Sequence, residues 1–444
     1  MKKSLLSLAL VCASAQAFDY TISGSAETFT KWGFNNVTPD VATGRAPTDS
    51  FTTLFSQLNL KADLGAGFAF GLGGSLAGLA FDSTQGFTAS GYSFNASPVQ
   101  ASYFGYSWDK GKVQNYMIQN AYLSYEGTHL YLKAGRYQSG KVGEWFSGYN
   151  QGAEGYIQSG AFKLWGFWSN RRAFAYNQWF LDFYRVHGLK KDIFAAGVDL
   201  TFGGFKTSVF SYYVDSKVTA PGVSFTYDTN TDFQLSGFRS LTRVRTLFPQ
   251  ALSSFDGLDT SADPKNPKDP DGIGSGQRDW GVINSSSATL WIDQRFDVNN
   301  FNFGVGIYKN FGNANELIGR YGNPVLSVVD FWTAGAYDIG QSLSDMVGKD
   351  AFTGYGYMGA TYGAFNWQVL ARGTNSPRSA EQSVALNLGY KIREDFKIGG
   401  KLEWFSDTTK AGYNPFQGVI VGQKLTANRT DDRSHIFFYM THTF

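Results

Sequence analysis

Apolar and polar residues alternate along most of the chain. From Leu54 to Leu64 the even positions are almost all apolar, whereas the odd positions from 53 to 61 carry Thr, Phe, Gln, Asn and Lys. Side chains on a β-strand point in turn to two faces, so a strand with one apolar and one polar face has this period of two. Glycines at 65 and 67 interrupt the run, and a second alternating run begins at Phe68. The pattern predicts a hairpin with a short turn.

The same unit recurs over the rest of the sequence. Clear alternating pairs occupy 117–134, 194–202 with the run after it, 288–307 and 384–404, and weaker pairs lie near 155–168 and 354–372. About sixteen strands can be placed in this way. Val223, Phe225 and Tyr227 also alternate and would add one hairpin inside the connection 217–285. The predicted number of strands is therefore sixteen or eighteen.

The connections between strands alternate in length. Turns such as 65–67 are very short, while the connections between hairpins are long: 82–113, 138–152, 170–190, 217–285, 311–353 and 407–432. Aromatic residues gather near the strand ends, as they do at membrane interfaces. Short turns on one rim and long loops on the other are typical of outer-membrane barrels. We therefore predict an all-β, transmembrane antiparallel β-barrel with short periplasmic turns and long extracellular loops, in preference to a large soluble β-protein.

Closure of the barrel follows from the solvent. Hydrocarbon offers no hydrogen bonds, and each exposed backbone group there costs several kcal/mol, so an open sheet edge is not tolerated. Composition fits this fold. Aromatic residues make up 17 % of the chain, Gly numbers 52, and charged residues reach only 17 %, against about 25 % in soluble domains. A mean hydropathy of −0.24 argues against a helical membrane protein.

The first residues have the features of a secretory leader. A cationic start with Lys2 and Lys3 precedes an apolar stretch, and Ala15-Gln16-Ala17 is a small-x-small cleavage site. We expect residues 1–17 to be removed, leaving 18–444 as a single barrel domain in the bacterial outer membrane. A lipoprotein acylated at Cys12 is the alternative, disfavoured because a small residue is needed where Val11 stands.

Removal of the leader changes the charge and the redox chemistry. Lys+Arg exceed Asp+Glu by two in the whole chain. Lys2 and Lys3 account for that excess, so the mature chain is neutral and nothing in its charge indicates a nucleic-acid partner. The single cysteine leaves as well, which excludes disulfides and thiolate chemistry from the mature protein.

The polar face of the predicted strands carries charges of both signs. Unpaired charge in an apolar interior is costly, and a barrel of this strand number is too wide for side chains to fill, so these residues indicate a water-filled channel for small hydrophilic, charged solutes. The basic residues of this wall are Lys31, Lys61, Lys133, Arg295, Arg372, Lys391, Lys397 and Lys401, and the acidic ones are Glu27, Asp199, Asp293 and Glu403.

The long loop 138–152 is the predicted constriction. It contains Lys141, Glu144, Trp145 and Tyr149. Charged side chains facing a narrow passage orient and select charged solutes. The alternative is that these residues cover the outer rim.

The segment 433–444 has the pattern of the closing strand. Phe438, Met440 and Phe444 share one face, and the chain ends on Phe444. A terminal Phe after alternating apolar residues resembles the signal read by the barrel-assembly machinery, and His442 departs from it mildly. The expected partners are this machinery, outer-membrane lipid with lipopolysaccharide, and small-molecule or ion solutes.

One stretch carries a family resemblance. The sequences NAYLSYEGTHLYLKAGRYQ (120–138) and EWFSGYNQG (144–152) resemble the Hof family of Helicobacter outer-membrane proteins, which is distantly similar to OprD-like porins. The resemblance implies an 18-stranded barrel that carries small solutes, either as a monomer or as a trimer. OprD-like channels hold an arginine ladder in the lumen. Here Arg295, Arg372, Lys397 and Lys401 would take that part, although this wall mixes Lys with Arg.

Enzymatic and cofactor readings find little support. The four histidines, His129, His187, His435 and His442, have no metal-binding spacing. His187 near Asp182 or Asp192 is the only candidate for catalysis, and 263–271 (DPKNPKDPD) lacks EF-hand spacing. We expect no enzyme, no metal and no cofactor. The second hypothesis is a surface adhesin or structural barrel, in which the apolar segment 311–353 would fold externally or block the lumen.

Overall fold

The computed structural model describes residues 19–40, 43, 45–86, 96–107, 109–185, 191–252, 287–315, 318, 322–329, 345–413 and 424–444. The predicted leader with Cys12, the catalytic candidate His187 and the acidic segment 263–271 lie outside these residues.

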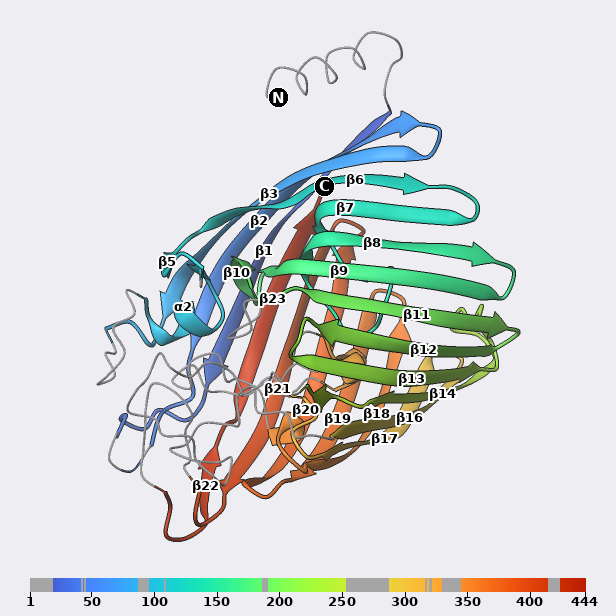
Figure 1. The fold of residues 1–444 in the computed structure, drawn as a ribbon. Helices are drawn as coiled ribbons and strands as arrows, with labels where there is room; N and C mark the ends of the chain where they lie inside the picture. The colour runs from blue at the N-terminus through green and yellow to red at the C-terminus, as the bar shows by residue number, and fades with distance from the viewer. Residues whose placement is uncertain are drawn as a thin grey trace.

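Eighteen antiparallel strands form a closed barrel, which confirms the higher of the two predicted strand numbers (Figure 1). The strands are β1 (Tyr20–Gly33), β2 (Phe51–Gly65), β3 (Phe68–Asp82), β6 (Tyr116–Glu126), β7 (Leu130–Gln138), β8 (Tyr149–Ser159), β9 (Phe162–Ala175), β11 (Ile193–Phe202), β12 (Phe205–Val214), β13 (Val218–Asp228), β14 (Phe238–Leu247), β16 (Ala288–Val298), β17 (Phe301–Phe311), β18 (Phe352–Tyr362), β19 (Phe365–Asn375), β20 (Ser379–Arg393), β21 (Phe396–Thr409) and β23 (His435–Thr443).

Smaller elements extend the barrel or lie in its loops. They are the strands β4 (Tyr106–Ser107), β5 (Lys112–Val113), β10 (Phe180–Tyr184), β15 (Gln250–Ala251) and β22 (Arg429–Asp432), the helix α2 (Pro98–Ser102), and the 3₁₀ turns η2 (Pro324–Ser327) and η4 (Asp345–Val347). No helix in the described part of the chain is long and apolar enough to cross a membrane.

The first and last strands close the ring. β1 pairs with β2 on one side and with β23 on the other, with Ser25 opposite Thr443. The backbones of Gly24 and Phe444 exchange two hydrogen bonds of 2.9 and 3.1 Å. Every long strand therefore has two neighbours, as burial of backbone groups in lipid requires.

The two faces of the sheet follow the sequence alternation. Leu54 and Leu58 on β2 are more than half exposed, whereas Phe51 and Phe55, at odd positions of the same strand, are buried. Leu386 and Leu402 on neighbouring strands are likewise exposed. A row of exposed aliphatic side chains at every second position is the lipid-facing surface of a membrane barrel. The opposite face points into the lumen.

The loop lengths differ from the prediction at four places. The connection 217–285 is shorter than predicted, because β13 and β14 lie in its first half and form the extra hairpin that the alternation of Val223, Phe225 and Tyr227 predicted. The long connection 34–50 was not predicted, because it contains apolar residues and the residue at which β1 ends could not be located from the sequence. The connections 215–217 and 376–378, on the long-loop rim, are as short as the turns of the other rim.

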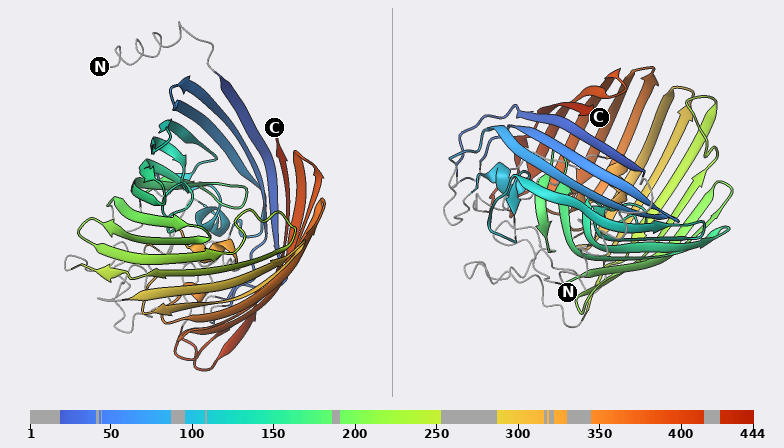
Figure 2. Two further views of the ribbon diagram at one scale, coloured as in Figure 1. Left: turned by 90° about the vertical axis from the view of Figure 1, so that its right-hand side faces the viewer. Right: turned by 90° about the horizontal axis from the view of Figure 1, so that it is seen from above.

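Several long loops fold inward instead of standing outside the barrel. Val99 and Phe104, in and after α2, pack against Phe51 and Phe180 in one buried cluster. Val325 and Met346, in η2 and η4, pack against Trp291 on the inner face of β16. The side view in Figure 2 shows these pieces inside the curve of the sheet. The loops therefore narrow the interior of the barrel.

Candidate functional site

The predicted wall residues lie at positions that alternate with the exposed apolar row. Leu132, Leu200 and Leu402 are exposed, so their sequence neighbours point to the other side of the pleat. On this inner side lie Lys31, Lys61, Lys133, Arg295, Arg372, Lys391, Lys397 and Lys401, with the acids Glu27, Asp199, Asp293 and Glu403. That they line a conducting path stays a prediction.

Some of these charges are buried in ion pairs. Lys31 lies 2.9 Å from Asp49, Lys401 lies 2.8 Å from Glu403, and Arg372 lies 3.2 Å from Glu381. All six side chains are at most 5 % exposed. Because a buried cation paired with a buried carboxylate is held in place, Arg372 and Lys401 tie the wall together instead of forming a row of free cations.

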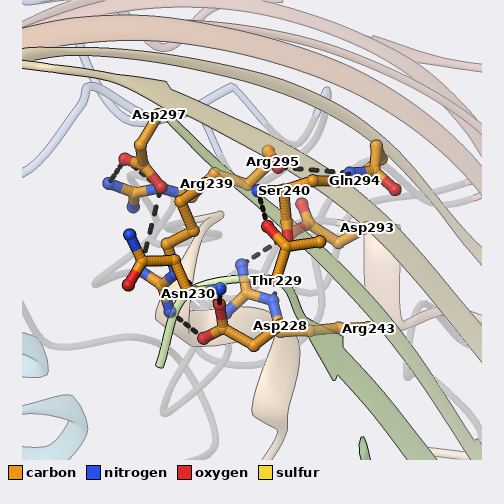
Figure 3. A network of polar contacts seen from close by, with 10 residues as sticks. All are labelled: Asp228, Thr229, Asn230, Arg239, Ser240, Arg243, Asp293, Gln294, Arg295 and Asp297. Atoms are coloured by element: carbon orange, nitrogen blue, oxygen red, sulfur yellow. Dashed lines mark hydrogen bonds and ion pairs between the residues drawn. The ribbon is translucent and has the colours of Figure 1, made fainter. Parts of the chain in front are cut away.

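The main arginine row lies on β14, which sequence analysis placed in a loop. Arg239, Arg243 and Arg245 share the inner face, because Phe238 beside them is exposed on the outer one. Arg239 pairs with Asp228 at 2.5 Å, and Arg243 pairs with Asp293 at 2.7 Å (Figure 3). The signal was present in the sequence as arginines at odd positions only, from 239 to 245.

Arg295 extends this network along β16. Its guanidinium donates to Asp297 at 2.6 Å, and Asp297 also lies 3.7 Å from Arg239 (Figure 3). Each arginine in the group therefore has a fixed carboxylate partner. The group forms a rigid charged surface, with donors to spare for a passing solute because each guanidinium carries five N–H groups.

The connection between β7 and β8, residues 139–148, lies against the inner face. Trp145 is fully buried with Val142 among inward side chains that include Trp165 and Tyr212. The backbone N–H of Trp145 donates to the Tyr212 hydroxyl at 3.1 Å. An aromatic anchor with its backbone bound in this way holds the loop on the β9–β12 wall.

Charged groups fix both sides of this inward loop. Lys141 lies 2.7 Å from Glu126, near the short-turn end of β6, and Glu144 pairs with Arg245 on β14. Tyr149 does not belong to the loop: it opens β8 and packs in the cluster around Phe51. The loop thus ends at 148, earlier than predicted, because the pairing of Gln138 with Tyr149 already starts the hairpin.

The connection between β17 and β18 comes in from the other wall and meets the first loop. Ser327 accepts a hydrogen bond of 3.3 Å from Arg243. Ile318 belongs to the buried cluster of Trp145. A Cβ atom on Gly322 would lie 2.6 Å from the backbone nitrogen of Phe146. The two loop backbones therefore touch, and glycine is required at 322. Within 311–353, these described residues lie inside the barrel.

The predicted assembly signal lies on the outer face of β23. Phe438 and Phe444 are 46 % and 62 % exposed, and Met440 is partly exposed between them. His442 lies on the same face beside Asp395, at 3.2 Å. Recognition of this strand by the assembly machinery stays a prediction.

The described residues show no arrangement for metal chemistry. Within these parts of the chain, no group of three His, Asp or Glu side chains is placed to hold a metal ion. Asp182, the predicted partner of His187, accepts from Lys110 at 2.7 Å and from Ser107 at 3.2 Å.

The pair of Glu144 and Arg245 predicts opposite effects of two substitutions. Glu144→Gln leaves the Arg245 charge without its counter-ion, so the anion-to-cation permeability ratio should rise about two- to fivefold. Arg245→Gln leaves the Glu144 charge, and the ratio should fall by a similar factor. Reversal potentials in asymmetric KCl measure both ratios. A shift of the same sign in both variants would show that this pair does not face the ion path.

Comparison with known proteins agrees with this architecture. The solved structure of Acinetobacter baumannii OccAB3 superposes with a TM-score of 0.60 at 11 % identity, over 96 % of this chain and 99 % of that one. Pseudomonas aeruginosa OpdK, solved with vanillate, gives a TM-score of 0.60 at 9 % identity, over 96 % of this chain and 100 % of that one. These similarities show that the chain has the closed β-barrel fold of the OprD and Occ channels.

The sequence itself identifies the family. Residues 5–444 match the family described as "Putative outer membrane protein", and the chain belongs to this family of Helicobacter outer-membrane proteins. The resemblance seen in 120–152 is thereby confirmed. Comparison with curated proteins gave no match.

Proposed function

We propose that the protein is a passive diffusion channel for small hydrophilic, charged solutes, with organic anions foremost. The observation that carries this proposal is the β14 arginine row, which lies between two inward loops. Arg245 pairs with Glu144 of one loop, and Arg243 bonds to Ser327 of the other. A solute that crosses the barrel beside these loops passes donors held in fixed positions, as ion-selective channels require.

The loop 139–148 is the constriction in this proposal. Its Lys141 and Glu144 present both signs of charge to the passage, and buried Trp145 anchors them. In the described part of the connection between β17 and β18, Val325 and Met346 pack on the wall that includes β16 and narrow the passage from there. One barrel with a similar fold was solved with vanillate, a carboxylate, and a basic wall suits solutes of that charge.

The environment of the barrel completes the proposal. Outer-membrane lipid and lipopolysaccharide surround the exposed apolar rows, and the assembly machinery inserts the chain through β23 after the leader of residues 1–17 is cleaved. The barrel works as a monomer or a homotrimer, and its chemistry needs no cofactor and no catalysis.

Planar-bilayer recording tests this function. The purified barrel should give stepwise openings, because a polar lumen conducts hydrated ions, and liposomes that contain it should swell in small charged solutes. Heat-modifiable gel mobility first shows that the barrel is folded. A folded barrel that stays silent at high protein load would contradict the channel and favour the adhesin, in which the long loops bind host or matrix molecules.

A further inference from the structure

The outer face of the barrel is not equally apolar all the way round. On β20 the even positions from 384 to 392 point outward and carry Val, Leu, Leu, Tyr and Ile, and all five side chains are exposed, as lipid contact requires. On β14 the outward positions 240, 242, 244 and 246 carry Ser, Thr, Val and Thr, and these side chains are only partly exposed. Gln294 continues the polar strip on the outer face of β16.

This strip lies at the depth of the hydrocarbon. Thr242 is the fifth of the ten residues of β14, and its register partner Gln294 is the seventh of the eleven residues of β16. Strands of about 9–11 residues span a membrane, so both residues lie near its middle. Because hydrocarbon has no hydrogen-bonding groups, polar side chains at this depth need partners in protein.

The polar side chains of the strip bond to one another and leave one donor over. The Thr242 hydroxyl donates to the amide oxygen of Gln294 at 2.6 Å, and the amide nitrogen of Gln294 donates to the Ser240 hydroxyl at 3.0 Å. The Ser240 hydroxyl can itself donate, but it has no acceptor among the described residues. Lipid tails leave this donor unsatisfied, whereas a polar side chain of a neighbouring protein segment can accept from it.

The surroundings of the strip suit contact with another protein wall. Val209, Val223 and Val305, on the strands to either side, are 61 %, 44 % and 62 % exposed and offer an apolar rim. The outward positions of β12, β13, β14 and β16 hold no charged residue, so a contact there buries no unpaired charge. The small side chains of β14 let a second backbone approach closely.

The wall on the far side of the ring has a different shape. β2 lies nine strands from β14 in both directions. This wall also carries outward hydroxyl groups, but Leu54 and Leu58 of β2 are 57 % and 54 % exposed and project from the surface. Lipid tails fill the spaces between projecting side chains, whereas the flat surface of β14 suits a second flat wall.

The width of the strip and its rim fits a ring of three barrels. The four strands β12, β13, β14 and β16 are consecutive neighbours in the sheet (Figure 1). They cover about 80° of an eighteen-stranded ring, and a copy in a closed ring of three meets its two neighbours in directions about 60° apart. One face can therefore hold both contacts, with β13 and β14 nearest the axis.

We propose that the outer face of β12, β13, β14 and β16 is the contact surface between copies of this chain, around the threefold axis of a homotrimer. The hydrogen-bonding groups of Ser240, Thr242 and Gln294 meet those of the neighbouring copies. This assignment goes beyond the proposed channel function, because it concerns the outer wall alone and holds whether or not the lumen conducts.

Cysteine cross-linking tests the contact surface. The single cysteine of the sequence is Cys12 in the predicted leader, so the chain 18–444, folded into lipid vesicles, offers a cysteine-free background. Thr242→Cys should give linked barrels with a short bis-maleimide, because three copies of this position surround the axis. Leu58→Cys, at the eighth of the fifteen residues of β2, is the matched control on the far wall and should give none. Equal linking in both variants, or none in Thr242→Cys, would overturn the contact surface.

The mass of the folded barrel in mild detergent is the second test. The wild type should have the mass of three chains, and Val244→Trp should raise the dissociation constant at least about tenfold, because a large ring does not fit a close contact. Leu58→Trp should leave the mass unchanged. Heat-modifiable gel mobility shows that each variant is folded. A folded wild type with the mass of one chain, or a Val244→Trp variant that still has the mass of three, would overturn the proposal. A trimer without conductance would contradict the channel alone.

Discussion

Replacement of residues 140–147 by a short Gly-Ser connection should raise the single-channel conductance about two- to fivefold. The exchange removes Trp145, Lys141 and Glu144 from the lumen together. The hairpin can close without them, because Gln138 already pairs with Tyr149 and the backbone N–H of Ser139 donates to the carbonyl of Gly148 at 3.0 Å. Planar-bilayer recording at fixed KCl concentration measures the effect.

Two point variants test how much of this effect depends on the Trp145 side chain. Trp145→Ala empties a fully buried aromatic position and should loosen the loop, which raises both conductance and its noise. Trp145→Phe keeps most of the contact and should stay close to the wild type. Unchanged conductance in the folded, loop-shortened barrel would mean that the narrowest point lies elsewhere.

Leu386→Arg should destabilise the barrel by about 2 to 4 kcal/mol, the cost of an arginine on the lipid face near the bilayer midplane. Leu386 lies at the middle of β20, in an outward row with Val369 and Leu402. Its neighbour Asn387 points to the lumen, so Asn387→Arg should cost less than about 1 kcal/mol. Chemical unfolding in lipid vesicles compares the two. Equal costs would show that the faces are assigned the wrong way round.

The sequence predicted the barrel because its constraint is local. The alternation from Leu54 to Leu64 can be read without knowing which strand pairs with which, and the short turn at 65–67 adds the register. Lipid on one side and water on the other impose that pattern on every strand. The position of β14, the second strand of the extra hairpin, was not predicted, because its outward residues include Ser240, Thr242 and Thr246 and the apolar half of the pattern is weak there.

The candidate site was only partly accessible from sequence. The alternation predicts that Lys133 and Asp293 lie on the inner face of the sheet. The partner of each charge, however, depends on contacts between distant segments. Arg245 meets Glu144 of the inward loop, and Arg372 is buried with Glu381. No spacing in the sequence shows that the first of these pairs joins an inward loop to the wall while the second joins two neighbouring strands.

The seam between β1 and β23 has a consequence for how the chain folds. The two strands that close the ring come from opposite ends of the sequence, with Lys31 opposite Phe437. Pairing of such distant segments forms late and slowly, because the chain between them must be ordered first. Until then the sheet has two free edges, which can pair with those of another chain. Unchaperoned refolding at high protein concentration should therefore favour aggregates over closed barrels.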